Sequence, residues 1–79
     1  MASEEETLKA IIQEFPHLKD KISELFDVST TFIELCEDYV LCLITIKKAE
    51  SMNEKVAKEE LTELRTVLLE LKEELLSRI

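Results

Sequence analysis

The sequence predicts an all-α protein, and three observations support this prediction. The chain of 79 residues contains no glycine and one proline, the residues that tight turns most often need. Leucine, glutamate, lysine and isoleucine dominate the composition, and several of these are good helix formers. Apolar residues recur at steps of three and four along most of the chain, which is the spacing of one helix face. A chain this short forms one domain, so we expect residues 1–79 to fold as a single helical unit.

The N-terminal third carries one apolar seam that passes through a proline. Ser3 followed by Glu6 is a capping-box pattern, which predicts that a helix begins near residue 4. The seam that follows consists of Leu8, Ile11, Phe15, Leu18, Ile22 and Leu25. Proline lacks a backbone donor and disfavours helical geometry at the residue before it. We therefore expect two short helices, over about 4–14 and 16–26, with a break or a sharp kink at Pro16.

The central segment is the most apolar part of the chain, and we expect the fold to be organised around it. Residues 27–29 suit a turn, and either Ser29 or Thr31 can cap the helix predicted over about 29–52. Its main seam consists of Phe32, Cys36, Tyr39, Leu43 and Ile46. More apolar residues lie off this seam, so the helix is expected to bury more than one face.

A turn within residues 51–56 separates the central helix from the last one in this prediction. Asn53 is the best helix breaker there, and an uninterrupted helix of about 50 residues would be roughly 75 Å long. The last helix is predicted over about 56–78, with a seam of Leu61, Leu64, Leu68, Leu71 and Leu75. Because the connection is short, the two long helices are expected to pack as an antiparallel hairpin. The N-terminal helical segment would then pack across them, completing a three-helix bundle or priming an oligomer.

The charge distribution disfavours several kinds of partner. The formal net charge is −8, from 18 acidic and 10 basic side chains, and the acidic excess is spread along the chain. Such a surface repels phosphate backbones and anionic membranes. No apolar run approaches the roughly 20 residues that span a bilayer, and the acidic N-terminus lacks the plan of a signal peptide. Two cysteines without a disulfide framework fit a reducing compartment. We expect a cytoplasmic protein that binds neither nucleic acid nor membranes.

Few residues are candidates for chemistry. Cys36 and Cys42 are six residues apart on one predicted helix, too far along its axis to form a disulfide with each other. His17 is the single histidine, so the chain has no pair of histidines at a metal-ligand spacing. A phosphate-binding loop would require glycine, which the chain lacks. The sequence therefore predicts no enzyme, no cofactor, no metal and no small-molecule substrate. The alternative is a small metal- or redox-dependent protein that uses Cys36, Cys42, His17 and nearby carboxylates.

The surplus of apolar side chains on the two long helices favours binding to a protein. The candidate interface residues lie off the main seams: Ile33, Val40, Leu41, Ile44, Leu69 and Leu76. Our preferred hypothesis is a non-enzymatic module that forms homo-oligomers or docks to a protein partner through these residues. A further hypothesis is an acidic protein that masks a basic, nucleic-acid-binding partner, whose binding would weaken steeply with salt.

Residues 64–75, LRTVLLELKEEL, resemble the closing LKKEKLxLKDEI pattern of the YdcH-like family of small bacterial proteins. The matching positions are Leu64, Leu69, Leu71, Lys72, Glu74 and Leu75. Residues 15–39 are similar to the opening of that family, in which an aromatic residue begins a short helix and a Phe-x-x-Leu starts the long one. The chain departs from the pattern over residues 37–39, where the family tends to carry a polar stretch with a histidine. The resemblance implies a cytoplasmic helical hairpin of unknown role and supplies no catalytic residues.

Overall fold

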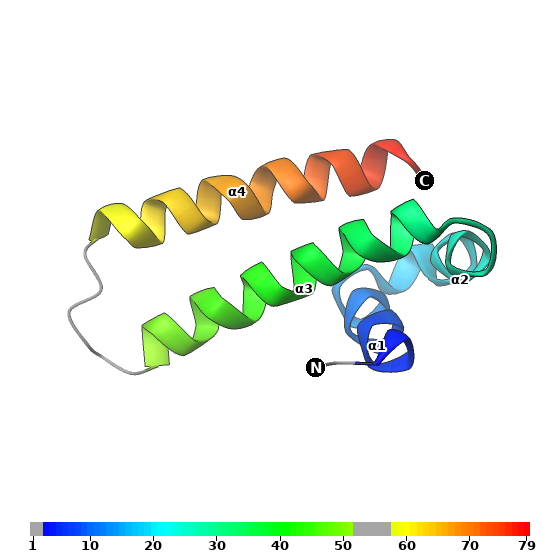
Figure 1. Cartoon of the computed structure of the whole chain (residues 1–79), viewed down its shortest axis with the longest axis horizontal. Coiled ribbons are helices and arrows are strands. Elements are labelled where there is room, and N and C mark those ends of the chain that lie inside the picture. The colour runs from blue at the N-terminus through cyan, green and yellow to red at the C-terminus, as the bar shows by residue number, and fades with distance from the viewer. Residues whose placement is uncertain (1–2, 52–57) are drawn as a thin grey trace.

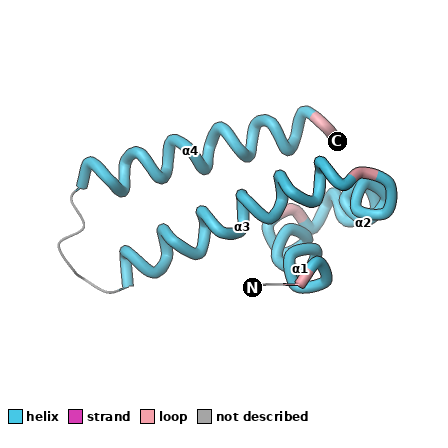
Figure 2. The backbone as a smooth tube through the Cα atoms, viewed as in Figure 1, coloured by secondary structure: helices cyan, strands magenta, loops and turns pink. Residues whose placement is uncertain are grey.

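The structure is a computed structural model that describes residues 3–51 and 58–79. Within these ranges the chain forms helices joined by short connections, without any strand (Figure 2). The elements are α1 (Glu4–Glu14), the 3-10 helix η1 (Pro16–Leu18), α2 (Lys19–Val28), α3 (Thr30–Ser51) and α4 (Lys58–Ser77). The predicted all-α class is confirmed. The predicted turn at 51–56, with Asn53, lies outside the described residues, as do the predicted end of the central helix at 52 and the predicted start of the last helix at 56.

Side-chain caps fix where α1 and α3 begin. The backbone N–H of Glu6 donates to Ser3 Oγ at 3.2 Å, as the capping-box pattern predicts. At the start of α3, the N–H of Phe32 donates to Ser29 Oγ at 3.1 Å. Ser29, rather than Thr31, is therefore the residue that caps α3.

The seam of the N-terminal third is broken at Pro16, as expected. Helix α1 ends at Glu14, and Phe15 leaves helical geometry with φ −132° and ψ 65°. The N–H of Leu18 then donates to the carbonyl oxygen of Phe15 at 3.0 Å, which closes one 3-10 turn before α2 begins. The break lets α1 and α2 contact each other as well as α3. It also leaves Phe15 buried, 6% exposed, at the corner between them.

Helix α3 is the central element, because it contacts α1, α2 and α4. Helices α3 and α4 lie side by side and run in opposite directions (Figure 1). Near the C-terminus of α3, the Glu50 carboxylate pairs with Arg65 at 3.3 Å. Helices α1 and α2 cover α3 on another side (Figure 1).

The core lies where α1, α2 and the C-terminal end of α4 meet α3. Its buried apolar residues include Ile11, Phe15, Ile22, Phe32, Leu35, Cys36, Tyr39, Val40 and Leu75. The ring centres of Phe15 and Tyr39 are 5.9 Å apart, and those of Phe26 and Phe32 are 6.0 Å apart in an edge-to-face pair. Such a pair contributes about 0.5–1.5 kcal/mol beyond its buried area. The predicted seam of α3 is buried except for Leu43, which is half-buried.

Helix α4 is covered on one side only. Leu75 is fully buried, whereas the other leucines of its seam, Leu61, Leu64, Leu68 and Leu71, are half-buried. The molecule measures 41 × 23 × 21 Å, and its radius of gyration of 13.3 Å exceeds the value of about 12 Å expected for a compact domain of this length. The elongated shape leaves much of the α3–α4 layer open to solvent.

Candidate protein-binding groove

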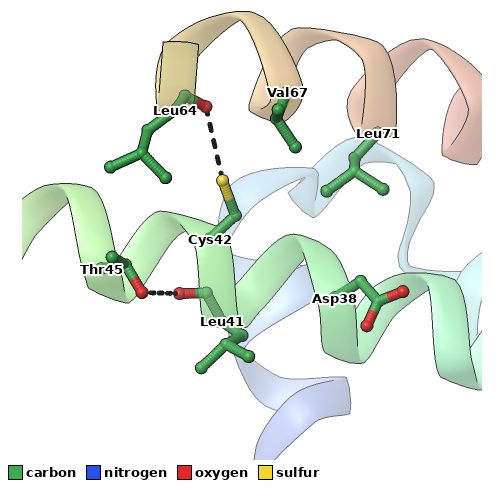
Figure 3. Close-up of a pocket in the computed structure, with 7 residues that line it drawn as sticks. All are labelled: Asp38, Leu41, Cys42, Thr45, Leu64, Val67 and Leu71. Atoms are coloured by element: carbon green, nitrogen blue, oxygen red, sulfur yellow. Dashed lines mark hydrogen bonds between the residues drawn. The ribbon is translucent and has the colours of Figure 1, made fainter. Parts of the chain in front are cut away.

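An open groove runs between α3 and α4 on the side of the layer away from the core. Its volume is about 380 Å³. Figure 3 shows the residues that line it. Helix α3 contributes Asp38, Leu41, Cys42 and Thr45, and helix α4 contributes Leu64, Val67 and Leu71. Residues at steps of three and four lie on one face of a helix, so each helix supplies one wall.

The groove is largely apolar: the side-chain polar atoms of Cys42 and Thr45 bond to backbone, and Asp38 is its one charged lining residue. The Cys42 thiol donates to the carbonyl oxygen of Leu64, with 3.4 Å between Sγ and O, and the Thr45 hydroxyl donates to the carbonyl oxygen of Leu41 at 2.8 Å (Figure 3). The aliphatic side chains of Leu41 and Val67 are 65% and 45% exposed. The two walls therefore present hydrocarbon to solvent.

Exposed carboxylates lie at helical spacing from the aliphatic residue of each wall, and Asp38 itself lines the groove. They include Glu34, Glu37 and Asp38 on α3 and Glu63 and Glu70 on α4. The α3 carboxylates precede Leu41 by seven, four and three residues, and the α4 carboxylates lie four before and three after Val67, so each set shares a face with its aliphatic residue. Lys48, seven residues after Leu41, places a positive charge at the far end of the same face. The rim of the groove, defined by these side chains, therefore carries more acidic than basic residues.

The opposite edge of α4 carries charges of both signs, since Glu73 lies four residues after Leu69 and three before Leu76. Leu69 is 56% exposed and Leu76 is 38% exposed, and basic residues lie beside them at helical spacing. Arg65 pairs with Glu50 at 3.3 Å, and Lys72 Nζ lies 5.9 Å from the centre of the Phe15 ring. Val67 and Leu69 are two residues apart, about 200° around the helix. The Leu69–Leu76 stripe is therefore a separate surface from the groove.

The predicted interface residues do not form one surface in the structure. Leu41 lines the groove, whereas Ile44, 48% exposed, lines a hollow of about 200 Å³ beside α1. Leu69 and Leu76 are exposed on the far edge of α4, and Ile33 is half-buried.

Val40 was predicted as an interface residue, but the structure buries it. It is 7% exposed and belongs to the core cluster, because α1 packs on that side of α3. Sequence reasoning also missed Val67. The available signal was that Val67 interrupts an acidic face, between Glu63 and Glu70.

The two thiols are poorly suited to nucleophilic chemistry. Burial and the nearby charge of Glu37 raise the pKa of Cys36 to about 12, and burial raises the pKa of Cys42. Because the thiolate is the reactive form, both side chains stay protonated near neutral pH. His17 is exposed in η1, whereas Cys36 is fully buried. Among residues 3–51 and 58–79, no three His, Cys, Asp or Glu side chains come together as a metal site would require.

None of the helices described here is long and apolar enough to cross a membrane. The chain matches no family model, no curated protein and no solved structure. The resemblance to the YdcH-like family therefore stays a prediction from the residues quoted for it.

Proposed function

We propose that this chain is a non-enzymatic protein-interaction module that binds another protein, or a second copy of itself, through the groove between α3 and α4. The observation that carries this proposal is the exposure of Leu41 and Val67 on two adjacent helices that together form one apolar groove. Burying apolar surface contributes about 25 cal/mol per Å². Contiguous exposed apolar surface on a small protein is typical of an interaction site.

The finer architecture belongs to the same proposal. Helices α3 and α4 act as an antiparallel hairpin, and the α1–α2 segment forms the third layer of a bundle. In this arrangement α1 and α2 cover one side of the hairpin and leave the groove side free for a partner. The resemblance to the YdcH-like family supports a hairpin, and the two free thiols support a reducing, cytoplasmic setting.

The raised thiol pKa values support an interaction role over a redox role. A redox protein needs an accessible thiolate, whereas burial keeps Cys36 and Cys42 protonated. A metal-dependent role has no support from the geometry of the described residues, because His17 is exposed while Cys36 is inside the core.

A paired substitution tests the proposal. Leu41→Ser with Val67→Ser removes the aliphatic walls of the groove at exposed positions, so the fold should be retained. Val28→Ser is a matched control, since Val28 is 80% exposed on α2 and does not line the groove. Circular dichroism and thermal unfolding establish that all three proteins are folded.

The readout is association, with itself or with a partner. Light scattering over a range of concentrations reports self-association. Partners captured by immobilised wild-type protein from a lysate of the cells that make it would be purified and titrated against each variant. We expect association that is lost in the groove pair and kept in the Val28→Ser control. Two results together would contradict the proposal. The wild-type protein would stay monomeric, and every partner that it captures would bind equally well to the Leu41→Ser, Val67→Ser variant.

A further inference from the structure

We infer that the partner of the groove is a basic amphipathic helix, a segment of another protein whose apolar row is flanked by lysine or arginine. This inference rests on the proposed function and names the chemistry of the partner. Two features of the groove carry it: its length along the two helices and the sign of the charge on its rim.

The dimensions of the groove fit a short stretch of helix. Its walls extend from Asp38 to Thr45 on α3 and from Leu64 to Leu71 on α4. Seven residues of helix rise roughly 10 Å, or two turns. A partner helix lying between the walls can insert apolar side chains at positions i, i+3 or i+4, and i+7, which is the pattern of helix-in-groove recognition. A volume of about 380 Å³ has room for a few aliphatic side chains.

The rim selects the charge of the residues beside that apolar row. Asp38 lines the groove on α3, and Glu70 is exposed three residues after Val67 on α4. By helical spacing, the flanking positions of a helix seated on Leu41 and Val67 therefore lie near these two carboxylates. Positive side chains there form ion pairs, whereas negative ones meet carboxylates on both sides. Solvent-exposed pairs of this kind add modest affinity each, but complementary charge fixes partner choice and accelerates association.

The same rim argues against a second copy of the chain as the occupant. A symmetric dimer that closes this groove on itself would bring the acidic rims of two molecules, each with a net charge of −8, against one another. A copy could present the Leu69–Leu76 edge of α4 instead, but Arg65 there already pairs with Glu50 and Lys72 already lies over Phe15. Such a contact would also be head-to-tail, which builds a ring or an open filament rather than a two-fold dimer.

Two synthetic peptides test the inference with the full chain. Both are fluorescein-labelled helices with leucine at the same i, i+4 and i+7 positions; one carries lysine at the flanking positions and the other carries glutamate. Fluorescence anisotropy measures their binding. We expect the lysine peptide to bind at least about tenfold more tightly than the glutamate peptide, and its affinity to fall as salt is raised. Equal binding of the two peptides, or binding of neither, would overturn the inference.

Charge-reversal variants separate the groove from the overall charge of the protein. Asp38→Lys with Glu70→Lys should remove the preference for the lysine peptide. Glu24→Lys with Asp27→Lys changes the net charge equally at exposed positions of α2, and it should leave the preference in place. If the α2 pair weakened binding as much as the groove pair did, net charge alone would explain the binding and the inference would be wrong.

The groove variant Leu41→Ser with Val67→Ser distinguishes failure of this inference from failure of the proposed function. It should weaken binding of the lysine peptide about tenfold or more. Unchanged binding would mean that the peptide does not use the groove, which overturns the inference. Self-association that requires Leu41 and Val67, without any preference for the lysine peptide, would refute the basic helix as partner and leave the proposed interaction role standing.

Discussion

The thiol of Cys42 on α3 donates a hydrogen bond to the carbonyl oxygen of Leu64 on α4, 3.4 Å away. This contact joins the two long helices at the floor of the groove (Figure 3). A thiol is a weak donor, so the contact holds the helices together mainly through packing. It nevertheless turns the one polar atom of the Cys42 side chain away from solvent, and this keeps the groove apolar.

Serine in place of cysteine should have different effects at the two positions. In Cys42→Ser the hydroxyl can still donate to Leu64, so the free energy of unfolding should fall by less than about 1 kcal/mol. Cys36→Ser places a hydroxyl in the fully buried core, and the expected loss is about 1–3 kcal/mol. Urea unfolding followed by circular dichroism measures both. If Cys42→Ser lost more stability than Cys36→Ser, the serine hydroxyl would not be replacing the thiol in the contact with Leu64.

Stability should decrease in alkaline solution. The pKa of Cys36 is raised from 9.0 to about 12 in the folded chain, chiefly by burial and then by Glu37. The unfolded chain loses the thiol proton first as the pH rises above 9, so the stabilising contribution is complete below pH 9 and is lost toward pH 12. The Cys36 thiol contributes a slope of up to about 1.4 kcal/mol per pH unit in that window.

A variant isolates the contribution of Cys36 to this pH dependence. Burial also raises the pKa values of Tyr39 and Cys42, so some alkaline loss of stability will persist without Cys36. Cys36→Ala should show a shallower decrease in unfolding free energy between pH 9 and 11 than the wild type. Identical slopes for the two proteins would show that Cys36 is not the dominant titrating group.

Substitutions in the leucine seam of α4 should lower the free energy of unfolding most at the C-terminal end of the helix. Leu75 is fully buried in the core cluster, and Leu75→Ala should cost about 2–4 kcal/mol of unfolding free energy. Leu68 is half-buried, so Leu68→Ala should cost only about 1–2 kcal/mol. Thermal or urea unfolding of the two variants gives the comparison. Equal costs would mean that the middle of α4 is as well covered as its end.

The N-terminal cap of α3 offers a local test of the turn between α2 and α3. Ser29→Ala removes the acceptor for the Phe32 N–H and should cost about 1 kcal/mol. Thr31→Ala serves as the control, because Thr31 is exposed and lies within the first turn of α3. A larger effect at Thr31 than at Ser29 would show that the helix begins two residues later in solution.

The elements of this fold were largely predictable from local rules. The capping box at Ser3 and the proline at position 16 act within a few residues, so the helix start at Glu4 and the break after Glu14 follow from the sequence. The main seam of α3 follows from its spacing, since a stripe of that period must be buried. Ser29 and Thr31 were both acceptable caps, and only the observed hydrogen bond distinguishes them.

The site was less predictable, because it depends on where helices pack. Val40 and Leu41 are adjacent and equally apolar, yet Val40 is 7% exposed and Leu41 is 65% exposed. The difference arises because α1 covers one side of α3 and leaves the other side free, and no local pattern encodes that choice. Val67 was not among the predicted interface residues, and it lines the groove with Leu41 because α4 packs beside α3. Which surplus apolar residues form a surface is therefore a property of the tertiary packing.

The most direct test of the groove as the binding site is a map of the peptide contact by NMR. Uniformly 15N-labelled full-length protein would be titrated with the lysine-flanked peptide, and the backbone amide shifts would be followed. We predict that the largest shifts fall on the walls of the groove, around Asp38, Leu41 and Val67. Shifts concentrated on the Leu69–Leu76 edge of α4, or spread evenly over the acidic surface, would contradict the assignment of the groove as the interaction site.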